Sequence, residues 1–125
     1  PGSRVENCII KQTLLTHGCQ LCGSVIENSV IGVRSVISHG CRLDRVVMMG
    51  ADYTESPQDI LKIRRQGMVP IGIDAGTTIR GAIIDKNARI GNRQGLENYD
   101  GEGYAIRDGI VVIEKNALIP NGTII

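Results

Sequence analysis

Residues 84–90 read Ile84-Asp85-Lys86-Asn87-Ala88-Arg89-Ile90, and they decide the fold because they return as Ile113-Glu114-Lys115-Asn116-Ala117-Leu118-Ile119. Both copies read aliphatic, acid, Lys, Asn, Ala, any residue, aliphatic, so their aliphatic positions are six residues apart. A six-residue repeat is typical of a parallel β-helix, in which each hexapeptide forms one side of a triangular coil. The two copies therefore predict a hexapeptide β-helix.

The composition agrees with a narrow prism. The chain has 125 residues, enough for one domain with a buried core, but no Phe or Trp and only three Tyr. Its core must be aliphatic, which suits stacked coils better than a sandwich or a bundle with aromatic anchors. With 14 basic and 13 acidic residues the chain lacks the basic excess of a nucleic-acid surface. No stretch has the length and apolarity of a membrane span, and no signal peptide is visible. From the charge balance and the lack of such a stretch, we expect neither nucleic acid nor a membrane as a partner.

The four cysteines are expected to pack, not to bind metal. They are Cys8, Cys19, Cys22 and Cys41. Cys19-x-x-Cys22 resembles half of a zinc or redox motif, but a structural zinc site needs four ligands and no second pair exists. We therefore predict reduced thiols, typical of a cytosolic or stromal compartment, and no metal site.

A second echo extends the repeat toward the N-terminus. The stretch that starts at Leu15 matches the later stretch that starts at Ile37. We interpret this spacing as one coil of three hexapeptides with a four-residue bulge, which stacks Leu15 on Ile37 about 4.8 Å apart. In a hexapeptide, position i and position i+4 point inward and position i+2 lies at the turn. Cys19 and Cys41 then point inward, and the histidines His17 and His39 stack at a turn.

The same period predicts further inward residues on both sides of a break. Before it, the predicted inward positions are Ile31, Ile37, Leu43 and Met49, with Ser35, Cys41 and Val47 at i+4. After it, they are Ile73 and Ile79, with Thr77 and Ile83 at i+4, and then Ile84 and Ile90. Residues 92–105 are polar and rich in glycine, which predicts a loop, and we expect Ile106 to resume the coil.

The break itself predicts a helical excursion over residues 51–70. Ser56 can cap a helix, and Gly67 can end it. The basic last turn, Arg64-Arg65, complements the helix dipole, and we expect it to be a solvated face.

The most informative consequence of the period concerns two lysines. The chain between Lys86 and Lys115 is long enough for one coil of three hexapeptides plus the predicted loop, which places both lysines on one corner of adjacent coils. At about 6 Å two ammonium groups repel by ~0.7 kcal/mol in water and ~3 kcal/mol at an effective dielectric near 20. A dianion between them reverses this, so a phosphate-bearing metabolite is the natural ligand. The alternative is that both lysines are solvated turn residues, neutralised by Asp85 and Glu114.

The histidines invite two other chemistries. Hexapeptide acyltransferases use an exposed turn histidine as general base, a role open to His39. Prism-shaped carbonic anhydrases hold zinc with three histidines, but this chain has two. We interpret His17 and His39 as solvated turn residues.

Five segments, in this order, resemble one family: Val-Ile-Gly-Val-Arg-Ser at 30–35, Met-Met-Gly-Ala-Asp-Tyr at 48–53, Val-Pro-Ile-Gly-Ile at 69–73, Ile-Ile-Asp-Lys-Asn-Ala-Arg-Ile-Gly at 83–91 and Asp-Gly-Ile-Val-Val at 108–112. The family is ADP-glucose pyrophosphorylase (glucose-1-phosphate adenylyltransferase) of the plant and cyanobacterial type. The segments resemble its C-terminal domain. The resemblance implies an all-β, left-handed parallel β-helix with one short helical excursion, forming a single domain over residues 1–125.

The resemblance also implies a function. The family makes ADP-glucose and pyrophosphate from ATP and glucose 1-phosphate with Mg²⁺, for starch or glycogen synthesis. Its enzymes are homo- or heterotetramers, activated by 3-phosphoglycerate and inhibited by phosphate, and found in the plastid stroma of plants and algae or the cytoplasm of bacteria. By motif, its effector-binding lysines correspond to Lys86 and Lys115.

Two departures from the family limit what this chain does alone. The nucleotide-binding signature of the catalytic domain is absent, so we expect no catalytic residue, no bound cofactor and no activity in this chain by itself. The segment after Ile90-Gly91 is shorter than in the family. Two alternatives stay open: a trimeric hexapeptide acyltransferase with His39 as base, and a purely structural module whose exposed coil edges pair with a partner.

Overall fold

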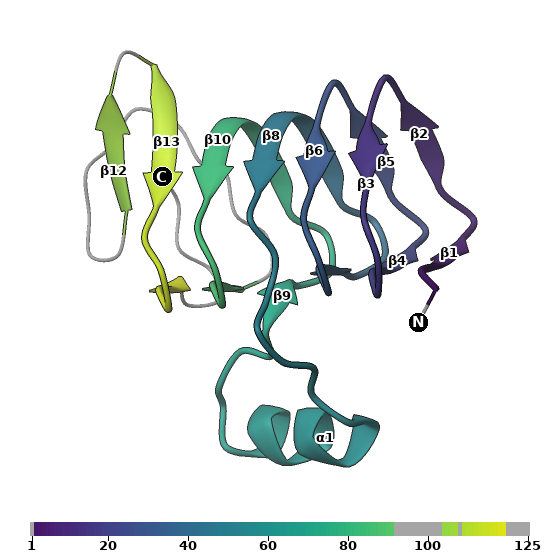
Figure 1. Ribbon diagram of the computed structural model, residues 1–125. Coiled ribbons are helices and arrows are strands. Elements are labelled where there is room, and N and C mark those ends of the chain that lie inside the picture. Colours follow the sequence, from purple (N-terminus) through teal and green to yellow (C-terminus); the bar gives the residue numbers. More distant parts are fainter. Residues whose placement is uncertain (1, 92–103, 108, 120–125) are drawn as a thin grey trace.

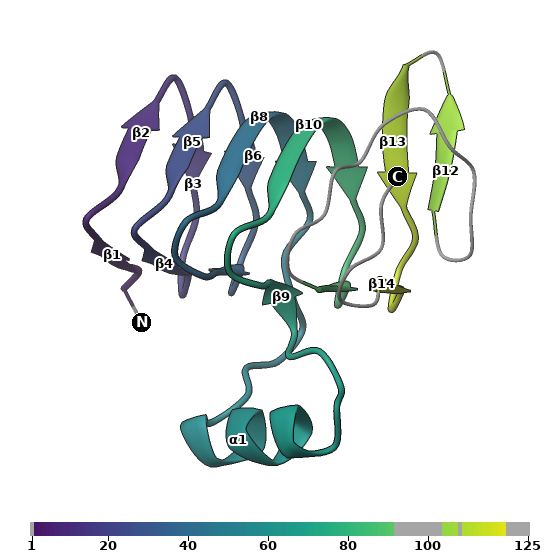
Figure 2. The same cartoon turned by 180° about the vertical axis from the view of Figure 1, so that it is seen from behind.

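The chain winds into a prism of short parallel strands, from which one helix projects (Figures 1 and 2). The computed structural model describes residues 2–91, 104–107 and 109–119. The strands before the excursion are β1 (Arg4–Glu6), β2 (Ile9–Lys11), β3 (Leu14–Leu15), β4 (Gln20–Cys22), β5 (Val25–Glu27), β6 (Val30–Ile31), β7 (Val36–Ile37) and β8 (Arg42–Met48). After the helix α1 (Pro57–Arg65) come β9 (Gly72–Ile73), β10 (Thr78–Ile84), β11 (Arg89–Ile90), β12 (Tyr104–Arg107), β13 (Ile110–Ile113) and β14 (Leu118–Ile119).

Strand pairing forms three walls. One wall is a six-stranded sheet in the order β1-β4-β7-β9-β11-β14. The other two share β8 and β10, which each bend around a corner: the first part of β8 pairs with β5, and its end pairs with β6. All of these pairs are parallel, as predicted, and the exception is β12, which runs antiparallel to β13. Ile106 therefore belongs to a hairpin, and the prediction that it resumes the coil is wrong.

The coils are shorter than three full hexapeptides. Leu15 pairs with Ile31 on the next coil, and Ile26 pairs with Leu43. The predicted stacking of Leu15 on Ile37 is therefore wrong, since Ile37 pairs with Leu21. The stretch that we interpreted from the six-residue period as one side with a bulge forms two sides of five residues each. These two sides meet at the buried Ile26.

Residues with positive φ make these short sides possible. Arg45, at φ 55°, turns the corner inside β8 with one residue fewer than a hexapeptide provides. The inward phase therefore moves back by one position: Val46 and Met48 are buried, whereas Val47 and Met49 are 39% and 48% exposed. The predictions of Val47 and Met49 as inward residues are wrong for this reason.

The same shift recurs one coil later. Gly81, at φ 62°, turns the corner inside β10, so that Ala82 is buried and Ile83 is 40% exposed, contrary to the prediction for Ile83. The other predicted inward positions of the described coils are buried: Ile31, Ser35, Ile37, Cys41, Leu43, Ile73, Thr77, Ile79, Ile84 and Ile90. The core is aliphatic, as the composition predicted.

The excursion contains the predicted helix. Ser56 caps the N-terminus of α1 in a capping box with Asp59. Just after the C-terminus of α1, Gly67 has a φ of 75°, which ends the helix. The basic last turn is not simply solvated, because Arg64 donates to both carboxylate oxygens of the buried Asp74, at 3.0 and 3.2 Å. This ion pair fastens α1 to the prism, a role the sequence pattern did not reveal. No helix in the described residues has the length and apolarity to cross a membrane.

Candidate functional site: a corner with two stacked lysines

Lys86 and Lys115 lie on the same corner of adjacent coils. Ile84 pairs with Ile113 before the corner, and Arg89 pairs with Leu118 after it. The backbone N–H of Asn116 donates to the carbonyl of Lys86 at 2.9 Å, which fixes the register at the turn itself. The predicted stacking of the two lysines is therefore confirmed, and we call residues 86, 87, 115 and 116 the lysine corner.

The asparagine that follows each lysine explains the turn. Asn87 and Asn116 have φ values of 62° and 60°, in the left-handed region that asparagine tolerates better than most residues. The side chain preceding each asparagine is directed away from the core: Lys86 is 46% exposed, and Lys115 is exposed. Two cationic side chains thus project one above the other from a rigid turn.

The same corner continues through the earlier coils. The backbone N–H groups of Arg34, Ala51 and Asn87 donate to the carbonyls of His17, Val33 and Gly50, at 2.9, 2.8 and 3.1 Å, as Asn116 donates to Lys86. His39 lies on a different corner, where its carbonyl accepts from Gly76. The predicted stack of His17 on His39 is wrong, because a coil is shorter than the spacing of the two histidines: the register that pairs Leu15 with Ile31 brings Val33 over His17 instead.

Asp52 completes the corner, and the sequence analysis missed it. Its Oδ1 lies 3.3 Å from Lys86 Nζ, and its Oδ2 accepts from Asn87 Nδ2 at 3.0 Å. The backbone N–H of Asp52 donates in return to Asn87 Oδ1 at 2.9 Å. These hydrogen bonds, from Asn87 first and then Lys86, lower the pKa of Asp52, and the charge of Lys115 acts in the same direction. Asp52 thus pairs with Lys86 and lies within electrostatic reach of Lys115.

The predicted neutralising residues act differently. Asp85 Oδ1 accepts from the backbone N–H of Lys86 at 2.7 Å, so it shapes the turn and does not pair with the ammonium group. Within the part of the chain that the structure describes, the ion pair at this corner joins Lys86 to Asp52 and does not include Lys115.

Comparison with known proteins identifies the domain. Residues 1–124 match the family described as the GLGC left-handed parallel β-helix domain. The chain belongs to this family. It is also 46% identical, over 133 aligned positions, to the protein named glucose-1-phosphate adenylyltransferase large subunit 1, chloroplastic/amyloplastic, of Zea mays. That match covers 100% of this chain and 26% of the maize protein, so the chain spans about a quarter of its relative. The family resemblance and the left-handed β-helix predicted from sequence are confirmed.

In this GLGC-type β-helix, the helical excursion is tied to the lysine corner through Arg89. Arg89 follows Lys86 by three residues and is 24% exposed. Its Nη1 donates to Glu55 Oε2 at 3.1 Å and to the carbonyl of Val69 at 3.0 Å, and its Nη2 donates to Tyr53 Oη at 3.3 Å. Arg89 thus holds both the start and the end of the excursion.

A groove of about 510 Å³ separates the excursion from the earlier coils of the same corner. His17 and Arg34 line it on one side and Thr54 and Ile60 on the other. Glu55 also lines this groove, so its lining carries charges of both signs.

The cysteines do not converge. Cys19 and Cys41 are buried, as predicted, whereas Cys22 is exposed, so the Cys19-x-x-Cys22 thiols lie on opposite faces of the wall. Burial raises the pKa of the Cys41 thiol. Among the described residues, no group of three His, Cys, Asp or Glu side chains is placed to hold a metal ion.

Proposed function

We propose that this chain is the regulatory and assembly domain of an ADP-glucose pyrophosphorylase, and that Lys86 and Lys115 bind a phosphorylated effector such as 3-phosphoglycerate or phosphate. The parent enzyme would make ADP-glucose from ATP and glucose 1-phosphate, with its Mg²⁺ and catalytic residues in a separate domain. The observation that carries the proposal is the register of the two lysines on one corner, in a domain of this family. The maize relative is a chloroplastic/amyloplastic protein, which favours the plastid stroma if this chain comes from a plant or an alga, and we propose the cytoplasm if it comes from a bacterium.

Stacked lysines suit a dianion for an electrostatic reason. Adjacent coils are about 4.8 Å apart, so two ammonium groups on one corner repel each other unless an anion lies between them. A phosphate group can accept from both lysines, since each ammonium has three donors. Both lysine side chains are exposed, so a ligand can reach them from solvent.

Regulation requires more than binding. An effector shifts the balance between two arrangements of an enzyme only if its affinity differs between them. We propose that the effector bridges the lysine corner to the catalytic domain, so that one arrangement completes the site and the other does not. Family membership favours this role over the acyltransferase alternative, whose proposed base, His39, lies on another corner.

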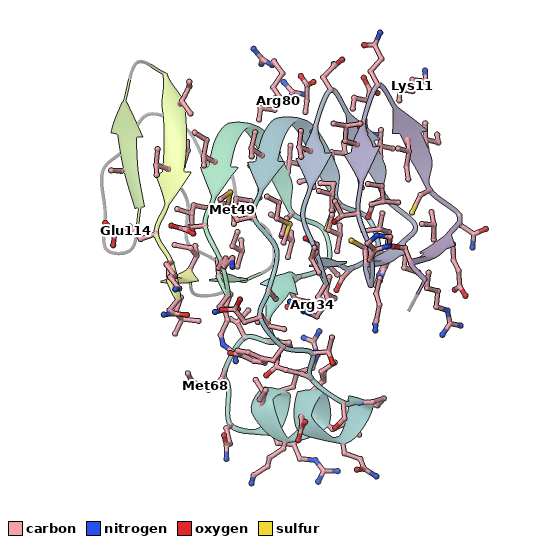
Figure 3. The ribbon with its side chains drawn as sticks, in the orientation of Figure 1. Lys11, Arg34, Met49, Met68, Arg80 and Glu114 are labelled. Carbon is pink, nitrogen blue, oxygen red and sulfur yellow. The ribbon has the colours of Figure 1, made fainter. Side chains whose placement is uncertain are left out.

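The test uses the assembled enzyme that carries this domain. Lys86→Ala and Lys115→Ala should each raise the 3-phosphoglycerate concentration for half-maximal activation by about tenfold, the loss of one charge-assisted contact. Lys11→Ala is the matched control, because Figure 3 shows Lys11 projecting from the prism on the side away from α1. Unaltered activation in the variant with both lysines replaced would exclude the effector site, and the chain would then be a purely structural module.

The assembly role is supported by one apolar wall. The outward side chains of β3, β6, β8, β10 and β13 form a column in register, which we call the aliphatic face: Leu14, Val30, Val47, Ile83 and Val112. The first four are 38–69% exposed. In Figure 1 these strands lie side by side, and α1 does not cover them. The neighbouring wall instead carries charged outward residues, among them Glu27, Asp44 and Arg80.

We propose that the aliphatic face packs against another pyrophosphorylase subunit, in a homo- or heterotetramer. An exposed apolar column of this kind marks an interaction surface. Val47→Lys should weaken assembly by about a hundredfold, because a lysine there would be desolvated without a partner. Thr78→Lys, outward on the neighbouring wall, adds the same charge as a control. Analytical ultracentrifugation measures the assembly of the Val47→Lys and Thr78→Lys variants. Equal assembly of the two would refute this interface.

A further inference from the structure

The carboxylate of Asp52 occupies the space beside the lysine corner where the proposed effector phosphate would bind. One oxygen lies 3.3 Å from Lys86 Nζ, and the other accepts from Asn87 at 3.0 Å. Asp52 also lies within electrostatic reach of Lys115 on the next coil. A carboxylate with these partners makes the same contacts that a phosphate oxygen would make.

We propose that Asp52 is a built-in competitor of the effector: it holds the anion position in the free domain, and a bound phosphate displaces it. This inference rests on the proposed function of the lysine corner and adds how the site is regulated. Asp52 thereby lowers the affinity of the lysine corner for anions, so that anions with weaker contacts than the effector do not bind.

Displacement is favoured over binding side by side. A phosphate dianion in contact with Lys86 would lie within a few ångströms of the Asp52 carboxylate, and the two anions would repel each other. The Asp52–Lys86 pair is about half exposed on both sides, and exposed pairs of this kind are weak. A dianion attracted by two lysines can therefore replace a single carboxylate held mainly by one.

Displacement would reach the excursion. Asp52 is the residue at which the chain leaves the prism, and the next residues, Tyr53 and Glu55, are held by Arg89. When the Asp52 side chain is released, the segment loses two of its hydrogen bonds to the corner, while the backbone bond from Asp52 to Asn87 Oδ1 can stay. Anion binding at the corner is thus coupled to the order of residues 52–56.

The experiment measures phosphate binding to the full-length enzyme by calorimetry, with inorganic phosphate as the probe. Asp52→Asn keeps the shape and the hydrogen bond from Asn87 but removes the charge. We expect it to bind phosphate about tenfold more tightly, since a dianion about 6 Å from the removed charge gains that much in water. Glu114→Gln removes one charge from the same corner without an ion pair to either lysine, and it should change the affinity less than about threefold.

A second readout follows the excursion. In the wild type, phosphate should raise hydrogen–deuterium exchange in a peptide spanning residues 52–56, and in Asp52→Asn, which lacks the ion pair with Lys86, part of this rise should be present already without phosphate. A gain in affinity cannot come from a damaged fold, so the two readouts together separate a competitor from a structural residue.

Each remaining outcome has a definite meaning. Unchanged or weaker phosphate binding in Asp52→Asn, with wild-type binding still dependent on Lys86 and Lys115, overturns the competitor role and leaves the effector site intact. An equal gain in Glu114→Gln also overturns it, since the effect would be one of net charge. Phosphate binding that survives Lys86→Ala and Lys115→Ala together overturns the effector site and the competitor role with it.

Discussion

Replacing Arg64 by methionine would leave the carboxylate of Asp74 unpaired inside the protein. Both guanidinium Nη atoms donate to Asp74, whose side chain is 4% exposed, and the remaining donor is the backbone N–H of Ala75 at 2.9 Å. Removing one partner of a buried ion pair costs about 3–5 kcal/mol. Because the Arg64 side chain is 47% exposed, water can replace part of the lost contact, and we expect the lower cost of about 2 kcal/mol.

A double-mutant cycle isolates the pair. Arg64→Met, Asp74→Asn and the double variant are unfolded in urea, and hydrogen exchange of α1 shows whether the excursion detaches first. We expect a coupling energy of about 1.5 kcal/mol, since Asp74→Asn removes the charge that needs Arg64. A coupling below about 0.5 kcal/mol, with α1 protected in all variants, would refute the view that this pair fastens the excursion.

The stabilisation by the Arg64–Asp74 pair should also change with pH in a definite direction. Burial raises the pKa of Asp74, but the hydrogen bonds from Arg64 and Ala75 outweigh burial and leave the pKa below its usual value. A carboxyl with a depressed folded-state pKa stabilises the fold above its unfolded pKa of about 3.9 and loses that contribution as the pH falls through the folded value. The stability difference between wild type and Arg64→Met should therefore be full at pH 7 and shrink as the pH falls through about 4. A difference that grows in acid would contradict this assignment.

Three further predictions concern the prism. A thiol reagent should modify the exposed Cys22 within minutes and spare Cys41, which is buried with a raised pKa; equal rates by mass spectrometry would contradict the fold. Gly50→Ala should lower the free energy of unfolding by about 2 kcal/mol or more, because φ is 98° and a Cβ would strike the backbone of Val33; unaltered urea midpoints would argue against this corner. Ile84→Ala should cost about 3–4 kcal/mol in the same assay, since its side chain is fully buried, and a cost under about 1 kcal/mol would place it outside the core.

The sequence predicted the lysine corner correctly even though it predicted the coil length incorrectly. The stretches 84–90 and 113–119 carry the same pattern, so any fold that repeats the pattern repeats the corner, whatever the exact length of a coil. The wrong coil length therefore misplaced Leu15 and His39, but it did not affect the predicted stacking of Lys86 and Lys115.

The errors have a local cause. A side of five residues differs from a side of six only in how its corner turns, and the corner depends on one residue with positive φ. Arg45 takes that conformation although nothing in its chemistry favours it, so no pattern of residue types marks the change. Long-range partners were equally hidden: Asp52 reaches Lys86 from a distant part of the chain, and Arg64 reaches Asp74 only because the excursion folds back.

The antiparallel strand β12 has a consequence for how this domain associates. In a β-helix the last coil presents the same row of backbone donors and acceptors as every coil before it, and can template a further copy. β12 lies against β13 in the opposite direction and occupies the hydrogen bonds that an incoming parallel coil would need there. At the β12 end of this wall a further parallel coil has no free edge to pair with, which disfavours filaments built by stacking coils end to end.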